Sequence, residues 1–168
     1  MERATYPILV YANPVTEDDA KENLFAFADE KLHELPPGQD VEKTTVPSFP
    51  RMAKCYGWLP FNRQVVQGIP RRRRPPVVKL PDIRRSLTSD KDYTAIVYEY
   101  IEEVDNDAGI VEAVDRFLWL AGFCHKDPGA RNWKGGVLVD HSAIVYPGAF
   151  GWDKGRYRRR KAPALLYC

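Results

Sequence analysis

The chain has 168 residues, of which 44% are hydrophobic, so it is long enough for one core and short for two ordinary domains. It has no run of about 18 apolar residues, and its first residues lack a charged lead and a small-residue cleavage site. Cys55, Cys124 and Cys168 stand far apart, which argues against a disulfide framework and a thiolate zinc site. We therefore expect one cytoplasmic domain, residues 1–168, without a membrane span.

The net charge of +2 conceals a strong alternation of acidic and basic segments. Residues 1–50 carry a net charge of −6, residues 51–91 of +9, residues 92–115 of −8 and residues 116–168 of +7. Charge sorted in this way creates local fields, which govern the encounter with a charged partner more than the total does. The near-neutral balance therefore does not exclude nucleic acid as a partner.

The first fifty residues predict a strand followed by a helix. Residues 6–12 are rich in β-branched and aromatic side chains and end at Asn13-Pro14, which is typical of a strand stopped by a turn. Thr16 and Asp19 have the spacing of a capping box. The apolar stripe expected on the helix consists of Ala20, Leu24, Phe27, Ala28 and Leu35. The helix is expected to end at Pro36-Pro37-Gly38.

The middle of the chain predicts loops and one well-marked strand. Residues 39–76 are interrupted by prolines, among them Pro47, Pro50, Pro60, Pro70 and Pro75, although residues 53–61 can form a short strand. A basic, proline-rich loop is expected at about residues 60–85. Residues 93–101 are apolar near their centre, which favours a strand buried on both faces in the middle of a sheet.

The last third predicts a second helix, two short strands and a tail. Asn106 or Asp107 can cap the helix, and Gly122 marks its end. The buried stripe expected on it consists of Ile110, Val114, Phe117, Leu118 and Ala121. Strands are expected at residues 136–140 and 143–146, before a basic aromatic tail at about residues 152–168. The chain is thus predicted to be α+β, with a mixed or antiparallel sheet and two main helices.

Three carboxylates gather at the start of the first helix. Asp18 and Glu22 project together, opposite the apolar stripe, with Asp19 beside them. Acidic side chains in the first turn interact favourably with the helix dipole. One interpretation is therefore that these residues only form a solvated polar face. The other is a cluster that binds a cationic substrate group or moves a proton.

The sequence Asp18-Asp19-Ala20-Lys21-Glu22, in a small chain with basic clusters, resembles the Asp-Asp-x-x-Glu signature of the fungal arginine-containing cyclodipeptide synthases. The resemblance implies that arginine and a second amino acid are joined into a cyclic dipeptide from arginyl-tRNA and another charged tRNA. It implies Asp18, Asp19 and Glu22 as catalytic residues and no metal or other cofactor. Positioning and removal of one proton would supply the chemistry, because the ester is already activated.

Two basic clusters interleaved with aromatic residues are candidates for binding tRNA. Guanidinium groups suit phosphates, and aromatic faces suit unpaired bases. The alternative is a basic surface that only improves solubility. The candidate residues are Arg71, Arg72, Arg73, Arg74, Arg156, Arg158, Arg159, Arg160 and Lys161.

A third motif, His125-x-Asp127 followed by Asn132 and then Asp140, is similar to the catalytic loop and metal-binding Asp of the protein-kinase and aminoglycoside-phosphotransferase superfamily. The order of elements over residues 93–146 agrees with that superfamily. The resemblance implies a reduced kinase-like lobe in which Asp127, Asn132 and Asp140 are alternative catalytic residues that use ATP and Mg²⁺. The sequence has no Gly-rich loop and no lysine in the strand expected at residues 6–12. The groups that usually hold the phosphates of ATP in this superfamily would therefore be missing.

Three functions therefore stay open at the level of sequence. The leading expectation is a tRNA-dependent cyclodipeptide synthase. The alternatives are a kinase-like phosphotransferase or pseudokinase, and a non-catalytic module that binds RNA. Each makes different demands on where the acidic and basic residues lie in the fold.

Overall fold

The fold is α+β, as predicted, in a computed structural model that describes residues 7–27, 42–73, 78–80, 83–85, 92–126 and 129–167. All strand pairs in this part of the chain are antiparallel. The sequence predicted one domain, and the structure groups the chain into two compact units. Unit 1 comprises Met1–Ala53 and Ile101–Cys168, and unit 2 comprises Lys54–Tyr100. Among the described helices, none has the length and apolar character to cross a membrane.

Unit 1 begins with an antiparallel strand pair whose first strand is held to the intervening helix by one buried amide. Strand β1 (Ile8–Tyr11) pairs with β2 (Lys43–Val46), and α1 spans Glu17–Phe27. The Asn23 side chain is fully buried; its Oδ1 accepts from the Tyr11 N–H at 2.8 Å and its Nδ2 donates to the Tyr11 carbonyl at 3.2 Å. The amide of Asn23 thus provides hydrogen-bond partners for the backbone N–H and carbonyl of Tyr11 on β1. The predicted continuation of α1 to residue 35 lies outside the described residues.

Helix α3 (Ala108–Leu120) is the central element of unit 1, and local signals define both of its ends. Asp107 is the N-cap, and its carboxylate accepts from the Ile110 N–H at 2.9 Å. At the other end, Gly122 has φ +87°, its N–H donates to Trp119 O, and the Phe123 N–H donates to Leu118 O, which is a Schellman motif. The predicted cap and stop are both confirmed.

The buried face of α3 differs from the predicted one by a small rotation. Val114, Leu118 and Ala121 are buried as expected, but Ile110 is 51% exposed and Val111 takes its place in the core. Val111 packs in a cluster whose other buried members are Val114, Leu118, Trp133, Leu138 and Leu165. The prediction for Ile110 was wrong. Ile110 lies in the first turn of α3, where no earlier large apolar residue of the helix helps to fix the direction of the stripe.

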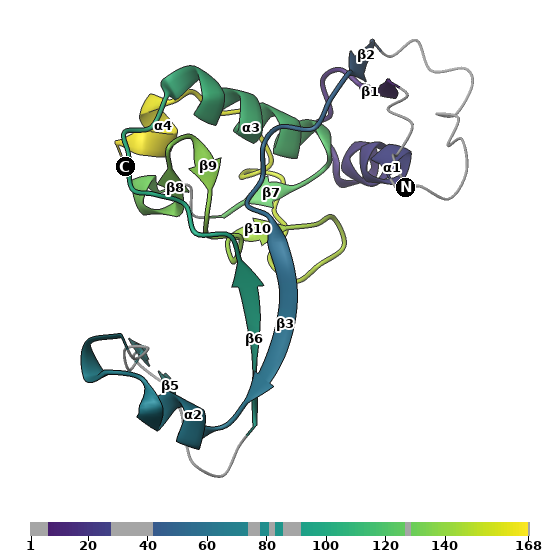
Figure 1. Cartoon of the computed structure of the whole chain (residues 1–168). Coiled ribbons are helices and arrows are strands. Elements are labelled where there is room, and N and C mark those ends of the chain that lie inside the picture. The colour runs from purple at the N-terminus through teal and green to yellow at the C-terminus, as the bar shows by residue number, and fades with distance from the viewer. Residues whose placement is uncertain are drawn as a thin grey trace. The chain divides into compact units, whose positions relative to one another are not determined.

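Short strands and turns follow α3 in unit 1 (Figure 1). Strand β7 (Cys124–His125) pairs with β10 (Ile144–Val145), and this pair brackets the hairpin of β8 (Trp133–Lys134) and β9 (Val137–Leu138). The short 3-10 turn η2 (Ala130–Asn132) precedes β8, and α4 (Pro163–Leu166) lies near the end of the chain. Leu165 of α4 is completely buried in the α3 core.

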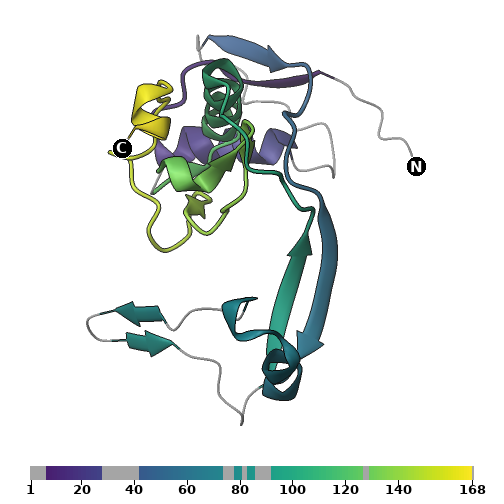
Figure 2. The same ribbon diagram turned by 60° about the vertical axis from the view of Figure 1, so that its left-hand side comes forward.

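Unit 2 consists of a two-stranded ribbon and smaller elements beyond its tip (Figures 1 and 2). Strand β3 (Cys55–Phe61) pairs with β6 (Tyr93–Tyr98). The segment between these strands contains α2 (Arg63–Gly68), the turn η1 (Arg71–Arg73), and β4 (Val78–Leu80) paired with β5 (Ile83–Arg85). The strand at residues 93–101 was predicted to lie mid-sheet, which is wrong, because its sheet has two strands and most of its side chains are exposed.

Candidate functional site

Asp19 is the carboxylate of a capping box at the start of α1. Its Oδ2 accepts from the N–H groups of Val15 and Thr16 at 3.0 and 2.9 Å, and the Asp19 N–H donates to the Thr16 hydroxyl at 3.1 Å. Partial burial raises the pKa of Asp19, but these hydrogen bonds and the charge of Lys154 outweigh it, so the pKa lies below its ordinary value. The carboxylate is therefore ionised and already engaged at neutral pH, which suits a helix cap better than a proton acceptor.

The other two carboxylates of the predicted catalytic set do not enclose a pocket with Asp19. The Asp18 side chain is 94% exposed, and its carboxylate lies 3.7 Å from the Lys21 ammonium, which also contacts Glu17 at 3.0 Å. Glu22 is half-buried. Burial raises the pKa of Tyr11, and the negative charges of Glu22 and then Asp19 raise it further. The acidic turn thus lies at the surface of unit 1, with Lys154 and Tyr11 within electrostatic reach.

The basic tail presents some of its cations to solvent and uses others in packing. Arg156, Arg158 and Arg159 are exposed. The Lys161 ammonium lies 3.3 Å from the carboxylate of Glu112 on α3, although most of its side chain remains exposed. The Ala162 N–H donates to the same carboxylate at 2.9 Å, and this bond is the main reason that the pKa of Glu112 is lowered.

Arg160 lies in a buried polar cluster that the sequence did not predict. Its Nη1 is 3.6 Å from the Asp115 carboxylate, and its Nη2 donates to the His125 carbonyl at 2.8 Å and to the Arg156 carbonyl at 3.0 Å. The Arg160 side chain is 9% exposed and that of Asp115 2%. Arg160 was a candidate for tRNA binding, but these contacts give its guanidinium a packing role. The available signal was Asp115 itself, a charged residue on the otherwise apolar face of α3.

In unit 2, the candidate arginines lie in and after the turn η1. Arg71–Arg73 form the turn, and the Arg73 N–H donates to the Pro70 carbonyl at 2.7 Å. Arg72 and Arg73 are exposed. Arg74 lies outside the described residues. This turn follows α2 directly, so two exposed guanidinium groups lie on the segment that connects β3 to β6.

Two residues of the kinase-like motif, Asn132 and Asp140, flank the hairpin of β8 and β9. The Val139 N–H donates to the Asn132 carbonyl at 2.8 Å, which brings the residues before β8 and after β9 together. Asn132 is buried and Asp140 is exposed. Hydrogen bonds from the Ser142 hydroxyl and then the Ser142 N–H lower the pKa of Asp140. Asp127, the expected base of this site, lies outside the described residues.

His125 on β7 and Trp133 on β8 are buried and carry polar atoms without hydrogen-bond partners among the described residues. His125 is 2% exposed, its Nδ1 is 3.8 Å from the Asp115 carboxylate, and neither ring nitrogen has a hydrogen-bond partner among the described residues. The indole N–H of Trp133 is also buried without a hydrogen-bond partner among the described residues. His125 therefore belongs to the core and does not line a surface site. In the described part of the chain, no three His, Cys, Asp or Glu side chains converge as metal ligands would.

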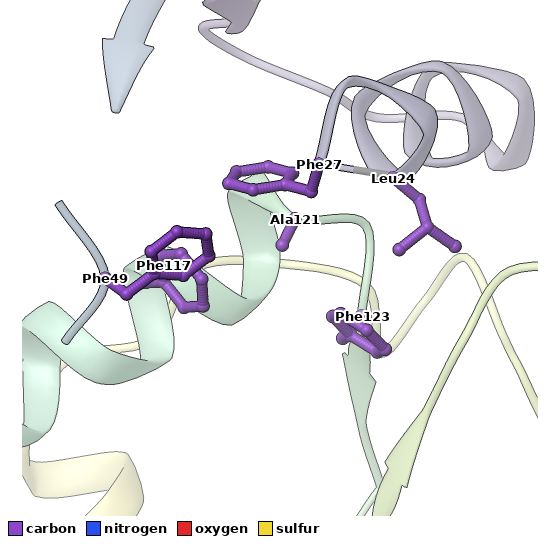
Figure 3. Close-up of a pocket in the computed structure, with 6 residues that line it drawn as sticks. All are labelled: Leu24, Phe27, Phe49, Phe117, Ala121 and Phe123. Atoms are coloured by element: carbon purple, nitrogen blue, oxygen red, sulfur yellow. The ribbon is translucent and has the colours of Figure 1, made fainter. Parts of the chain in front are cut away.

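An apolar pocket of about 230 Å³ opens between α1, α3 and the segment after β2 in unit 1 (Figure 3). Phe27, Phe49 and Phe117 pack edge to face around it, with ring centroids 5.5 to 6.0 Å apart. The remaining lining residues are Leu24, Ala121 and Phe123. Ligand pockets usually measure about 300–1,000 Å³ and include a few polar groups, so this hollow is small and lacks the groups that would orient a substrate.

Comparisons of this chain with family models, with curated proteins and with solved structures find no match. Its function is therefore argued from its own residues.

Proposed function

We propose that the chain binds RNA through its exposed arginines. The supporting observation is that both basic clusters display guanidinium groups at the surface, Arg72 and Arg73 in unit 2 and Arg156, Arg158 and Arg159 in unit 1. A guanidinium presents several donors in a fork that fits phosphate oxygens, and it remains charged at all physiological pH values. Five exposed guanidinium groups suit a ligand that carries many phosphates.

Three acidic residues of unit 1 are engaged in other contacts, whereas others, such as Asp18 and Asp105, are exposed. Glu112 contacts Lys161, and Asp115 is buried beside Arg160. Asp19 serves as the cap of α1. Binding to phosphates releases counterions, so the affinity should fall steeply as the salt concentration rises.

Fluorescence anisotropy with labelled, uncharged tRNA tests the proposal. The logarithm of the association constant should fall linearly with the logarithm of the salt concentration, and Arg72→Ala with Arg73→Ala should reduce the slope by about 1 to 2. Arg116→Ala is the matched control, because Arg116 is an exposed arginine on α3 outside both clusters. Binding that is insensitive to salt, or an equal effect of the control, would refute the proposal.

The cyclodipeptide synthase expected from the sequence would add chemistry to this binding. In its favour, Lys154 of the C-terminal segment lies close enough to lower the pKa of Asp19, so the acidic turn borders the basic part of unit 1. Incubation with charged tRNAs and mass spectrometry of the small molecules tests it. A cyclic dipeptide that forms without ATP and disappears in Asp18→Ala would support the synthase. Asp105→Ala, at another exposed acid, should leave the yield unchanged.

The hairpin of β8 and β9 favours the phosphotransferase as a second candidate. Mg²⁺ takes carboxylate and amide oxygens, and the bond between Val139 and Asn132 brings one residue of each kind, Asn132 and Asp140, to the same end of the hairpin. Asp140 is ionised and exposed, so it fits a metal ligand. Bound Mg²⁺ would orient and neutralise nucleotide phosphates. Calorimetric titration with Mg-ATP should then give a signal that Asp140→Asn abolishes and Asp105→Asn retains.

A further inference from the structure

The ribbon of β3 and β6 exposes one face that is rich in aromatic side chains. Trp58 pairs with Ile96, so their side chains lie on the same face of the ribbon, and Tyr98 follows two residues after Ile96. Tyr56 lies beside them along β3, at the register shift between Cys55 and Gly57, where the alternation of faces is interrupted. We call these four residues, Tyr56, Trp58, Ile96 and Tyr98, the aromatic face. Tyr56 is 63%, Trp58 71% and Ile96 60% exposed.

The opposite face of the ribbon carries a stacked aromatic pair and two exposed aliphatic side chains, Leu59 (44% exposed) and Val97 (36% exposed). There Phe61 and Tyr93 stack with ring centroids 5.6 Å apart and an interplanar angle of 28°. Phe61, Tyr93 and Ala95 are half-buried. The two faces therefore differ, and the larger aromatic surface is left to solvent on the aromatic face. Contiguous exposed apolar surface of this kind usually marks a binding site.

A local irregularity of β3 shapes the aromatic face. The strand register shifts between Cys55 and Gly57, so Tyr56 is the extra residue of a β-bulge, and Gly57 has φ +118°. Bulges increase the local twist and redirect side chains. The Lys54 ammonium lies 5.3 Å from the centroid of the Tyr56 ring, which places a cation over this aromatic ring.

The charge of unit 2 selects among the possible partners. Residues 54–100 contain ten Lys and Arg and four Asp and Glu, a net charge of +6. An aromatic surface in a unit with this net positive charge complements a ligand that is negatively charged and has flat apolar rings. Nucleic acid has both properties, and in a duplex the base faces are already stacked on each other, so only unpaired bases are available.

We infer that the aromatic face binds unpaired nucleotides of a single-stranded nucleic acid by base stacking, while Lys54, Arg72 and Arg73 attract the phosphates. This inference rests on the RNA binding proposed above and names the part of the RNA that unit 2 recognises. It gives the chain a preference for single strands over duplexes that the arginines alone do not supply.

Anisotropy with a fluorescein-labelled 12-nucleotide oligouridine and a 12-base-pair RNA duplex tests this inference. Stacking contributes about 1–3 kcal/mol per base, so Trp58→Ala should weaken binding of the single strand by about 5- to 150-fold and binding of the duplex by much less. Trp58→Phe should retain most of the affinity. Phe150→Ala is the control, because Phe150 is a fully exposed ring in unit 1. Circular dichroism establishes that each variant is folded.

The outcomes separate this inference from the proposed function. If the wild-type chain binds neither probe, the proposed RNA binding fails and the inference fails with it. If it binds both probes equally and Trp58→Ala has no effect, RNA binding stands and the stacking surface is refuted. Light scattering adds a third outcome: a wild-type dimer that Trp58→Ala converts to a monomer would show that a second copy covers the aromatic face, which also refutes the inference.

Discussion

The carboxylate of Asp115 on α3 accepts a hydrogen bond from the Arg160 backbone N–H at 2.9 Å and lies 3.6 Å from the guanidinium of the same residue. One acid thus holds both the main chain and the side chain of a residue 45 positions away. The contact fastens the C-terminal segment onto α3, beside the buried Leu165 of α4. It also explains why this arginine differs from its exposed neighbours.

Arg160→Ala should strongly destabilise unit 1, whereas Arg158→Ala should not. Removing one partner of a buried ion pair leaves the other charge uncompensated and typically costs about 3–5 kcal/mol, while exposed substitutions stay within about 0.5 kcal/mol. Chemical denaturation of the two variants measures the difference. Replacing both partners by apolar residues, Asp115→Leu with Arg160→Met, should recover much of the loss. Equal stability of the two single variants would show that the pair is not structural.

Gly122→Ala should be more damaging than Gly148→Ala. Both glycines have positive φ, +87° and +88°, so each alanine incurs the conformational strain of about 1–2 kcal/mol. At Gly122 the new Cβ would also lie 2.2 Å from the backbone carbonyl oxygen of Ala20 on α1, whereas at Gly148 the nearest atom is 4.0 Å away. The loss of unfolding free energy should therefore be clearly larger at Gly122. Similar losses at both sites would indicate that α1 and α3 do not approach each other closely there.

The sequence predicted best those features that depend on neighbouring residues. The capping box of Thr16 and Asp19, the N-cap Asp107 and the stop at Gly122 are each set by side chains within a few positions. Such local hydrogen bonds need no knowledge of the rest of the fold. Both main helices were therefore expected at their observed starts.

Features that depend on distant pairing could not be predicted in the same way. The apolar centre of residues 93–101 was compatible with a buried strand, but the choice between a central strand and a two-stranded ribbon depends on which strands pair. Likewise, the spacing of Asp115 and Arg160 gives no sign that they meet. The catalytic role expected for Asp18, Asp19 and Glu22 stays a prediction, and the structure adds that Asp19 accepts hydrogen bonds from residues three and four positions before it.

Asp19 should make the stability of the chain depend on pH in the acid range. Its folded-state pKa lies below the ordinary value of 3.8, so its stabilising effect is complete above that value and is lost as the pH falls through the lower folded-state pKa. The difference in unfolding free energy between wild type and Asp19→Asn should be up to about 1 kcal/mol at pH 6 and should shrink as the pH falls below 3.8. Asp18→Asn is the control, because this carboxylate is almost fully exposed. A constant difference between pH 6 and pH 2 would contradict the capping role.

Tyr157 should produce the corresponding loss of stability at alkaline pH. Its hydroxyl donates to the Trp119 carbonyl at 2.8 Å, and its ring contacts Trp152 at a centroid distance of 5.2 Å. Burial raises the pKa of Tyr157 above its ordinary value of 10.0, and the nearby charges of Asp19 and Cys124 raise it further. The fold thus favours the neutral phenol, so the stabilisation is fully present below pH 10 and is lost as the pH rises toward the folded-state value.

Tyr157→Phe separates the hydrogen bond from the titration. At pH 7 it should lower the unfolding free energy by about 1 kcal/mol, because the hydrogen bond to the Trp119 carbonyl is lost. Above pH 10 its stability should fall less steeply than that of the wild-type chain, since the residue that the fold holds neutral is absent. Tyr167→Phe, at an exposed tyrosine, should follow the wild-type curve throughout. Thermal unfolding between pH 7 and pH 11 measures all three, and parallel curves for wild type and Tyr157→Phe would show that the phenol does not couple folding to pH.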